Sequence, residues 1–129
     1  MAIKVNQGTK YLYTFKQGAA EGDATMRDLL GGKGANIAEM CNLNFPVPAG
    51  VTITTEACQT YRTLETEEEK DSLVNRLAKK AYKQLSKLHD KEYMPLVSVR
   101  SGARISMAGM MDTILNVGLT VGRFSELFP

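Results

Sequence analysis

The chain has 129 residues and a formal net charge of +2, with 43% hydrophobic and 23% charged residues. This composition indicates one globular domain with a single core, and the charge is too small to support binding to nucleic acid or to an anionic membrane. No apolar run has the length of a membrane span, and the two cysteines lack CxxC spacing, so we expect a cytoplasmic protein without thiol chemistry.

A β-strand is expected at residues 11–15, where aromatic side chains alternate with others in a β-prone run. A short turn of helix should follow at residues 25–30, before a glycine-rich loop. A longer helix is then expected at residues 33–43. The side chains expected on its buried face are Ile37, Met40 and Cys41.

Pro46 should end this helix, because proline cannot continue the hydrogen-bond ladder and restrains the residue before it. Residues 50–54 then predict a buried strand. Thr55 is expected to be the N-cap of a short helix that runs to about Tyr61. Cys58 lies in this helix and is expected to be buried.

The clearest helix signal follows Thr66, which with Glu69 has the spacing of a capping box. Apolar residues then recur at helical intervals at Leu73, Val74, Leu77, Ala78, Ala81, Leu85 and Leu88. Four lysines stand mostly off this stripe and predict a solvated face, since no aromatic residues lie among them to suggest nucleic-acid binding. His89 should lie at the negative end of the helix dipole, where an imidazole is well placed, so we expect no catalytic role for it.

The run Gly31, Gly32, Lys33 and Gly34 comes immediately before the second predicted helix. Glycines let the backbone turn tightly and approach a ligand, and a helix start offers free N–H groups to phosphate. The spacing is not that of Walker A, because Gly34 stands where Ser or Thr would hold magnesium. Two interpretations therefore stay open from these residues: a phosphate site that uses Lys33, or a plain loop entering a helix.

Residues 96–100 predict a strand that ends in Arg100, with Gly102 available for a turn. An arginine at a strand end can bind phosphate oxygens through two parallel hydrogen bonds. The alternative is an arginine paired with a surface carboxylate.

Residues 106–113 contain three methionines and lead into a further predicted strand at residues 113–117. Methionines usually fill gaps in a core, which is one interpretation of this segment. In the other, Ser106, Gly109 and Thr113 close over phosphate through N–H and hydroxyl groups.

The predicted fold class is α/β (α+β), with one mixed sheet and packed helices, and residues 1–129 are expected to form a single domain. The strands of this sheet are expected at residues 11–15, 50–54, 96–100 and 113–117.

Several ordered blocks of the chain resemble the start of the pyruvate phosphate dikinases. These blocks are residues 11–15, 28–40, 46–58, 96–103 and 109–116. The resemblance covers nearly the whole chain and is weakest at residues 62–95. It implies that the chain is the first lobe of an ATP-grasp nucleotide-binding domain, incomplete relative to the family.

The resemblance also implies that Lys33 and Arg100 match the family's two basic contacts to the ATP phosphates, with ATP and Mg²⁺ as cofactors. Gly109 and Thr113 match positions in the phosphate-covering loop and the following strand of the related phosphoenolpyruvate synthases and rifampin phosphotransferases. Ala108 departs from the proline that is usual in the dikinases, which implies a looser loop. No residue is expected to be catalytic or to bind a metal.

The family's second lobe, with its magnesium-binding carboxylates and adenine pocket, has no counterpart in these 129 residues, nor do its phosphohistidine and pyruvate-binding domains. We therefore expect an ATP- or phosphate-binding N-terminal portion of a dikinase-like phosphotransferase that does not complete the reaction alone. A protein partner could supply the missing lobe. The alternatives are a non-catalytic module that binds a protein partner or a phosphate metabolite, and a fragment without independent function. Neither nucleic acid nor membrane is expected to bind.

Overall fold

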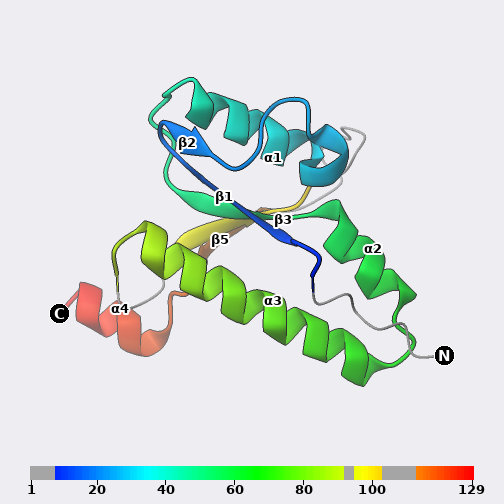
Figure 1. Ribbon diagram of the computed structural model, residues 1–129. Coiled ribbons are helices and arrows are strands. Elements are labelled where there is room, and N and C mark those ends of the chain that lie inside the picture. Colours follow the sequence, from blue (N-terminus) through cyan, green and yellow to red (C-terminus); the bar gives the residue numbers. More distant parts are fainter. Residues whose placement is uncertain (1–7, 92–94, 103–112) are drawn as a thin grey trace.

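The computed structural model describes residues 8–91, 95–102 and 113–129, and Figure 1 shows the arrangement of their helices and strands. It confirms the mixed α/β class. The elements, in chain order, are β1 (Leu12–Lys16), β2 (Ala19–Ala20), α1 (Arg27–Asn42), β3 (Gly50–Ile53), α2 (Thr55–Thr63), α3 (Glu67–Leu88), β4 (Val97–Arg100), β5 (Thr113–Val117) and α4 (Val121–Leu127).

The strands lie where the sequence predicts them, but they form two antiparallel sheets instead of one mixed sheet. β1 is the centre of a three-stranded sheet of order β2-β1-β3, and it pairs with β3 from Leu12↔Ile53 to Phe15↔Gly50. In the part of the chain that the structure describes, β4 pairs with β5 alone. The expectation of one sheet is wrong because hydrophobic periodicity identifies a strand without saying which edge it joins.

The three-stranded sheet lies between helices. In Figure 1, β1 and β3 pass between α1 above and α3 below. Successive side chains of a strand point to opposite faces, and β1 follows this rule. Leu12 packs on a cluster shared with α2 and α3, whereas Tyr13 packs on a cluster built from α1. β1 therefore contributes to both halves of the core.

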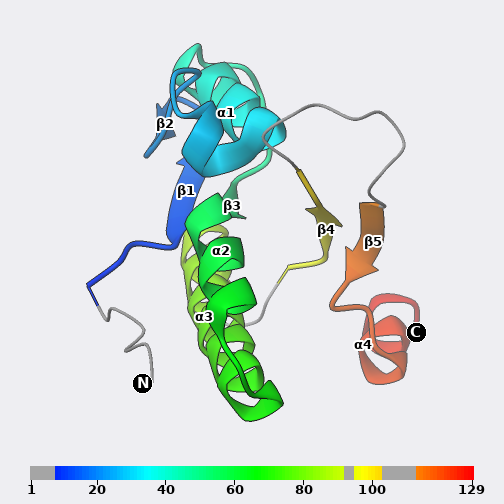
Figure 2. The same cartoon turned by 90° about the vertical axis from the view of Figure 1, so that its right-hand side faces the viewer.

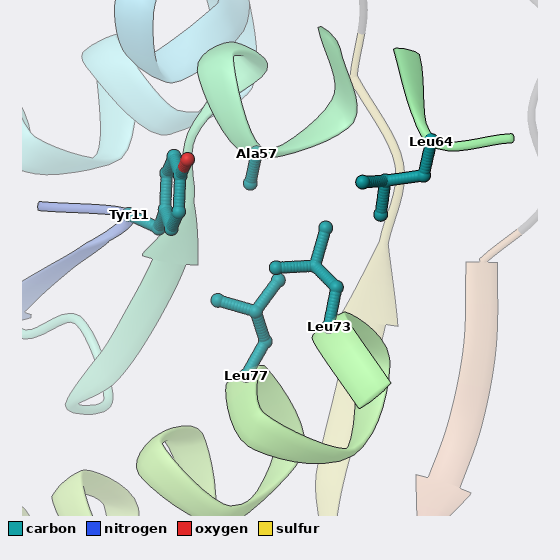
Figure 3. Close-up of a cluster of buried hydrophobic side chains, with 5 residues drawn as sticks. All are labelled: Tyr11, Ala57, Leu64, Leu73 and Leu77. Atoms are coloured by element: carbon teal, nitrogen blue, oxygen red, sulfur yellow. The ribbon is translucent and has the colours of Figure 1, made fainter. Parts of the chain in front are cut away.

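The cluster below the sheet joins α2 to α3. Leu73 and Leu77, one turn apart on α3, face Ala57 and Leu64, with Tyr11 beside them (Figure 3). The Tyr11 hydroxyl lies 2.9 Å from the Thr60 hydroxyl oxygen, so its polar end has a partner. Burying each leucine contributes about 1.5–3 kcal/mol, which makes this cluster the main support of the long helix.

Both predicted helix caps can be compared with the structure. The capping box at α3 is confirmed, because Thr66 Oγ1 accepts a hydrogen bond from the Glu69 amide and Glu69 Oε2 accepts one from the Thr66 amide. The cap of α2 is wrong by one residue. Thr54 caps this helix by accepting from the Ala57 amide, while the Thr55 hydroxyl donates to the Asp28 carbonyl at 2.6 Å. Thr55 therefore ties α2 to the first turn of α1.

The buried face of α1 consists of small residues, which the sequence prediction only partly anticipates. Cys41 is fully buried as expected, but Met40 is 44% exposed. Cys58 of α2 is exposed, so the prediction of its burial is wrong, and Val74 of the apolar stripe on α3 is 49% exposed. A helix that lies close to a sheet has room only for small side chains at the contact. The buried α1 residues after its first turn are Gly31, Gly34, Ala35, Ala38 and Cys41.

The elements β4, β5 and α4, here called the C-terminal unit, contain no buried residue. Figure 2 shows them on one side of the molecule, away from β1 and β3. Their large apolar side chains that are exposed are Val99, Ile114, Leu115, Val121, Phe124 and Leu127, and Phe128 directly after α4 is exposed too. A two-stranded hairpin is marginally stable in water on its own.

None of the described helices combines the length and apolar character needed to cross a membrane.

Candidate functional site

The glycine run bends α1 sharply at Gly31. This residue has φ 73° and ψ 169° within the helix, a region that is essentially restricted to glycine. The short helical segment before it buries Leu30, and Met26 and Leu29 pack on the same cluster. The structure thus confirms a turn of helix, then a glycine turn, then a longer helix.

Gly34 holds the second segment of α1 close to β3. A Cβ atom at this position would lie 2.9 Å from Thr52 Cγ2 and 3.1 Å from Leu30 Cβ. Neither neighbour can move far, because one belongs to the sheet and the other to the preceding turn. The close contact fixes the height of the glycine turn above the sheet and hence the position of Lys33 between Gly31 and Gly34.

Lys33 is exposed and reaches the end of β4. Its Nζ donates a hydrogen bond to the Ser101 carbonyl oxygen over 2.8 Å, although the two residues are 68 positions apart. The glycine turn and the residue after Arg100 are therefore side by side. In Figures 1 and 2, the end of β4 passes beside the first half of α1.

Arg100 is the last residue of β4 and is exposed. It lies opposite Thr113, the first residue of β5, in the antiparallel ladder. Within residues 8–91, 95–102 and 113–129, its guanidinium forms no hydrogen bond or ion pair. Pairing with a surface carboxylate is thus not seen among these residues, and the guanidinium is accessible to an anion.

Three of the four predicted site residues come together at one end of the hairpin. Lys33 contacts Ser101, Arg100 precedes Ser101, and Thr113 lies across the ladder from Arg100. Gly109, with Ser106 and Ala108, lies outside the described residues, so its predicted role remains a prediction.

Arg27 also lies beside the glycine turn, and it is not among the residues that the sequence predicts for the site. Its Nη2 atom would be 3.2 Å from a Cβ placed on Gly32. Residues five positions apart do not share a face of a straight helix, so the spacing in the sequence hides this contact. The glycine pair that bends the helix is the signal that could have revealed it.

No metal centre accompanies these cations in the described part of the chain. Groups of three or more His, Cys, Asp or Glu side chains suited to a metal ion do not occur there. His89, the C-cap of α3, has its Nε2 atom 2.9 Å from the Ala49 carbonyl oxygen. It therefore joins the end of α3 to the residue before β3, which is a structural role.

A surface hollow of about 530 Å³ lies elsewhere, between β1 and α3, and the predicted site residues do not line it. Lys10 and Glu21 at its rim form an ion pair at 2.6 Å. Burial acts to raise the pKa of Glu21, but hydrogen bonds from Lys10 and Thr14 outweigh it, so this pKa lies below its usual value. The charged groups of Lys10 and Glu21 at this hollow are thus already paired with each other.

Comparison with known proteins gives a family match at the glycine turn. Residues 27–79 match the family described as pyruvate phosphate dikinase, AMP/ATP-binding domain. This match includes Arg27, Lys33 and the glycines between them, and it ends before Arg100.

Relatives of the chain include dikinases from bacteria and plants. It is 49% identical over 115 residues to pyruvate, phosphate dikinase of Rhizobium meliloti (strain 1021) and 50% identical over 113 residues to the protein of that name from Clostridium symbiosum. It is 45% identical over 113 residues to the chloroplastic pyruvate, phosphate dikinase of Flaveria pringlei.

Each of these alignments covers 85% of the chain but only 12–13% of the relative, so the chain spans a small part of the length of the curated relatives that it matches. The chain belongs to the pyruvate phosphate dikinase family, and its residues 27–79 lie in the AMP/ATP-binding domain of that family.

Proposed function

We propose that the chain is the ATP- and phosphate-binding N-terminal portion of a dikinase-like phosphotransferase, in which Lys33 and Arg100 bind the phosphates. The observation that supports this proposal is the contact between Lys33 Nζ and the Ser101 carbonyl, because it joins the glycine turn to the residue that follows Arg100. The family match at residues 27–79 supports the choice of a nucleotide as the ligand.

The two cations have complementary chemistry. Lys33 is a point charge on a flexible stem, whereas the planar guanidinium of Arg100 can bind two phosphate oxygens at once. A phosphate oxygen is a stronger acceptor for an ammonium than a neutral carbonyl, so Lys33 can exchange Ser101 for the ligand. In phosphoryl transfer, positioning and neutralisation of charge account for most of the catalysis. We propose that the Thr113 hydroxyl and the Gly109 backbone complete the contacts.

We propose ATP with Mg²⁺ as the cofactors of the whole enzyme. Lys33 and Arg100 are cations that fit phosphate, and among the described residues there is no group of three or more His, Cys, Asp or Glu side chains suited to a metal ion. Carboxylate ligands for Mg²⁺ would come from a second lobe, supplied by further polypeptide or by a partner. The 129 residues alone are therefore proposed to bind the ligand without completing the reaction.

A titration with pyrophosphate, followed by NMR, tests this function. We expect shifts at the amides of residues 31–36 and 100–102, with an affinity in the millimolar range, or about 4 kcal/mol. Lys33→Ala should weaken binding through lost charge, and Arg100→Lys should weaken it through loss of the planar fork. Arg62→Lys, on α2, is the matched control and should bind like the wild type. Unchanged amide shifts in both segments would refute the proposal.

A second candidate function is a non-catalytic module that binds a protein partner, and the exposed C-terminal unit favours it. Large apolar side chains on β4, β5 and α4 are left uncovered, and such surfaces mark sites of association. The same pyrophosphate titration separates the two candidates, since a partner-binding module needs no response at Lys33.

For the compartment we propose the cytoplasm, although the relative from Flaveria pringlei is named as chloroplastic.

A further inference from the structure

Arg27 folds back over the glycine turn. It is the first residue of α1, and a Cβ on Gly32 would lie 3.2 Å from its Nη2 and 4.0 Å from its Cζ. In a straight helix, these two positions would point to different sides. The positive φ of Gly31 bends the backbone between them and brings the guanidinium over Gly32, the residue immediately before Lys33.

The Arg27 guanidinium is exposed, and within the described residues it has no hydrogen bond or ion pair. Glu39, an acidic side chain on the same helix, is already occupied, since its Oε2 accepts from the Ala24 amide at 3.1 Å. Arg27 thus brings an unneutralised charge to the turn that carries Lys33.

We infer that Arg27 is a third cationic contact for the phosphate ligand, acting with Lys33 and Arg100. The inference rests on the proposed function, because it concerns the same anion. Arg27 and Lys33 belong to α1, and Arg100 ends β4 immediately before Ser101, which accepts the hydrogen bond from Lys33. A ligand with several charged oxygens spread over more than one phosphorus, such as pyrophosphate or the phosphate chain of a nucleotide, suits three separated cations better than a single phosphate does.

Gly32 has a specific role in this arrangement. Its φ is not positive, so alanine is compatible with its backbone. An alanine Cβ would, however, lie 3.2 Å from Arg27 Nη2, which is tighter than an ordinary contact, so the guanidinium would have to shift by a few tenths of an ångström. Gly32→Ala should therefore keep the fold and weaken the ligand contact of Arg27. This gives a way to move the guanidinium without removing it.

The experiment is a pyrophosphate titration of the full chain, observed at the arginine Nε–Hε and backbone amide signals. The Arg27 side-chain signal should shift with the same dissociation constant as the Lys33 amide, while the Arg62 side-chain signal stays in place. Arg27→Ala should lower the affinity about tenfold, because it removes a charge-assisted hydrogen bond. Arg27→Lys should lower it less, and the control Arg62→Ala should leave it unchanged.

A double-mutant cycle separates ligand contact from general damage to the turn. Gly32→Ala should weaken binding in the wild-type background and have no further effect in the Arg27→Ala background. Equal losses in both backgrounds would overturn the role of Arg27. So would wild-type affinity in Arg27→Ala while Lys33→Ala and Arg100→Lys lose affinity, and the proposed function would then stand. A wild-type chain that does not respond to pyrophosphate would overturn both.

Discussion

Gly31 and Gly34 hold the glycine turn in place for different physical reasons. Gly31 supplies a backbone conformation that a side chain would oppose, and Gly34 lets α1 approach Thr52 of β3. Lys33 lies between them and extends to Ser101. The position of this lysine is therefore set by backbone geometry on both sides of it, which is what a fixed anion contact requires.

Gly31→Ala should destabilise the protein by about 1–3 kcal/mol, because alanine at φ 73° and ψ 169° is strained. Gly32→Ala is the matched control, since its φ is not positive, and it should cost less. The free energies of unfolding in urea, compared with the wild type, measure both effects. Equal stabilities of the two variants would show that the backbone at Gly31 can relax.

The two cysteines should differ in reactivity. Cys41 is fully buried, and burial raises the pKa of its thiol, so little thiolate is present at neutral pH. Cys58 is exposed on α2. A disulfide reagent should modify one thiol quickly and the second only in denaturant, and Cys58→Ser should remove the fast phase. Two fast thiols in the native protein would contradict the packing of α1.

At the scale of elements, the start of α3 makes stability depend on pH. A hydrogen bond from the Thr66 backbone amide, aided by the Thr66 hydroxyl, holds the pKa of Glu69 below its usual value. A carboxylate with a lowered pKa stabilises the fold at pH values above its unfolded pKa of about 4.3. This contribution is lost as the pH falls through the lower, folded value.

Glu69→Gln should therefore flatten the acid dependence of stability, because glutamine does not titrate. Between about pH 5 and pH 3, the variant should lose less of its free energy of unfolding than the wild type does. Glu68→Gln, at the neighbouring exposed position in the same turn, is the control and should follow the wild type. The measurement is urea unfolding at several pH values, and parallel curves for all three proteins would contradict the role of the cap.

Local patterns in the sequence predict most elements but not their partners. The capping box and the spacing of Leu73, Leu77 and Leu85 identify α3 because both signals depend on neighbours along the chain. The predictions that Met40 and Cys58 are buried are wrong because burial depends on which side of a helix meets its neighbours in the fold. The short strand β2 and helix α4 have too few residues to show a period, and neither was predicted.

The candidate site likewise has features that the sequence predicts and contacts that it does not. The glycine turn follows from composition, and Lys33 and Arg100 are identified by resemblance to a family. The contact between Lys33 and Ser101, the residue after Arg100, spans 68 positions and comes only from tertiary packing. Arg27 could not be found from spacing, because its contact with Gly32 exists only when Gly31 bends the helix.

At the scale of the whole molecule, the C-terminal unit should be the least stable part of the described fold. Its hairpin has two strands and no buried residue, whereas β1 lies between two neighbours and contributes to both clusters. Amide hydrogen exchange should be faster in β4 and β5 than in β1 and β3, because opening the hairpin exposes little apolar surface. Similar protection in both sheets would show that this unit is held more firmly than its packing indicates.

Ligand binding should reduce this difference in amide hydrogen exchange, and the effect should depend on particular residues. An anion held by Lys33 on α1 and by Arg100 on β4 would connect the C-terminal unit to the core by charged contacts in place of the Lys33–Ser101 hydrogen bond. At ten times its dissociation constant, a ligand that binds only the closed form stabilises that form by about 1.4 kcal/mol, which slows exchange about tenfold. Pyrophosphate should therefore protect the amides of β4 and leave those of α2 unchanged. Lys33→Ala should abolish the added protection at the same pyrophosphate concentration, whereas Lys79→Ala on α3 should retain it. Protection that persists in Lys33→Ala would mean that the anion binds the hairpin alone, and that α1 and β4 do not share a ligand.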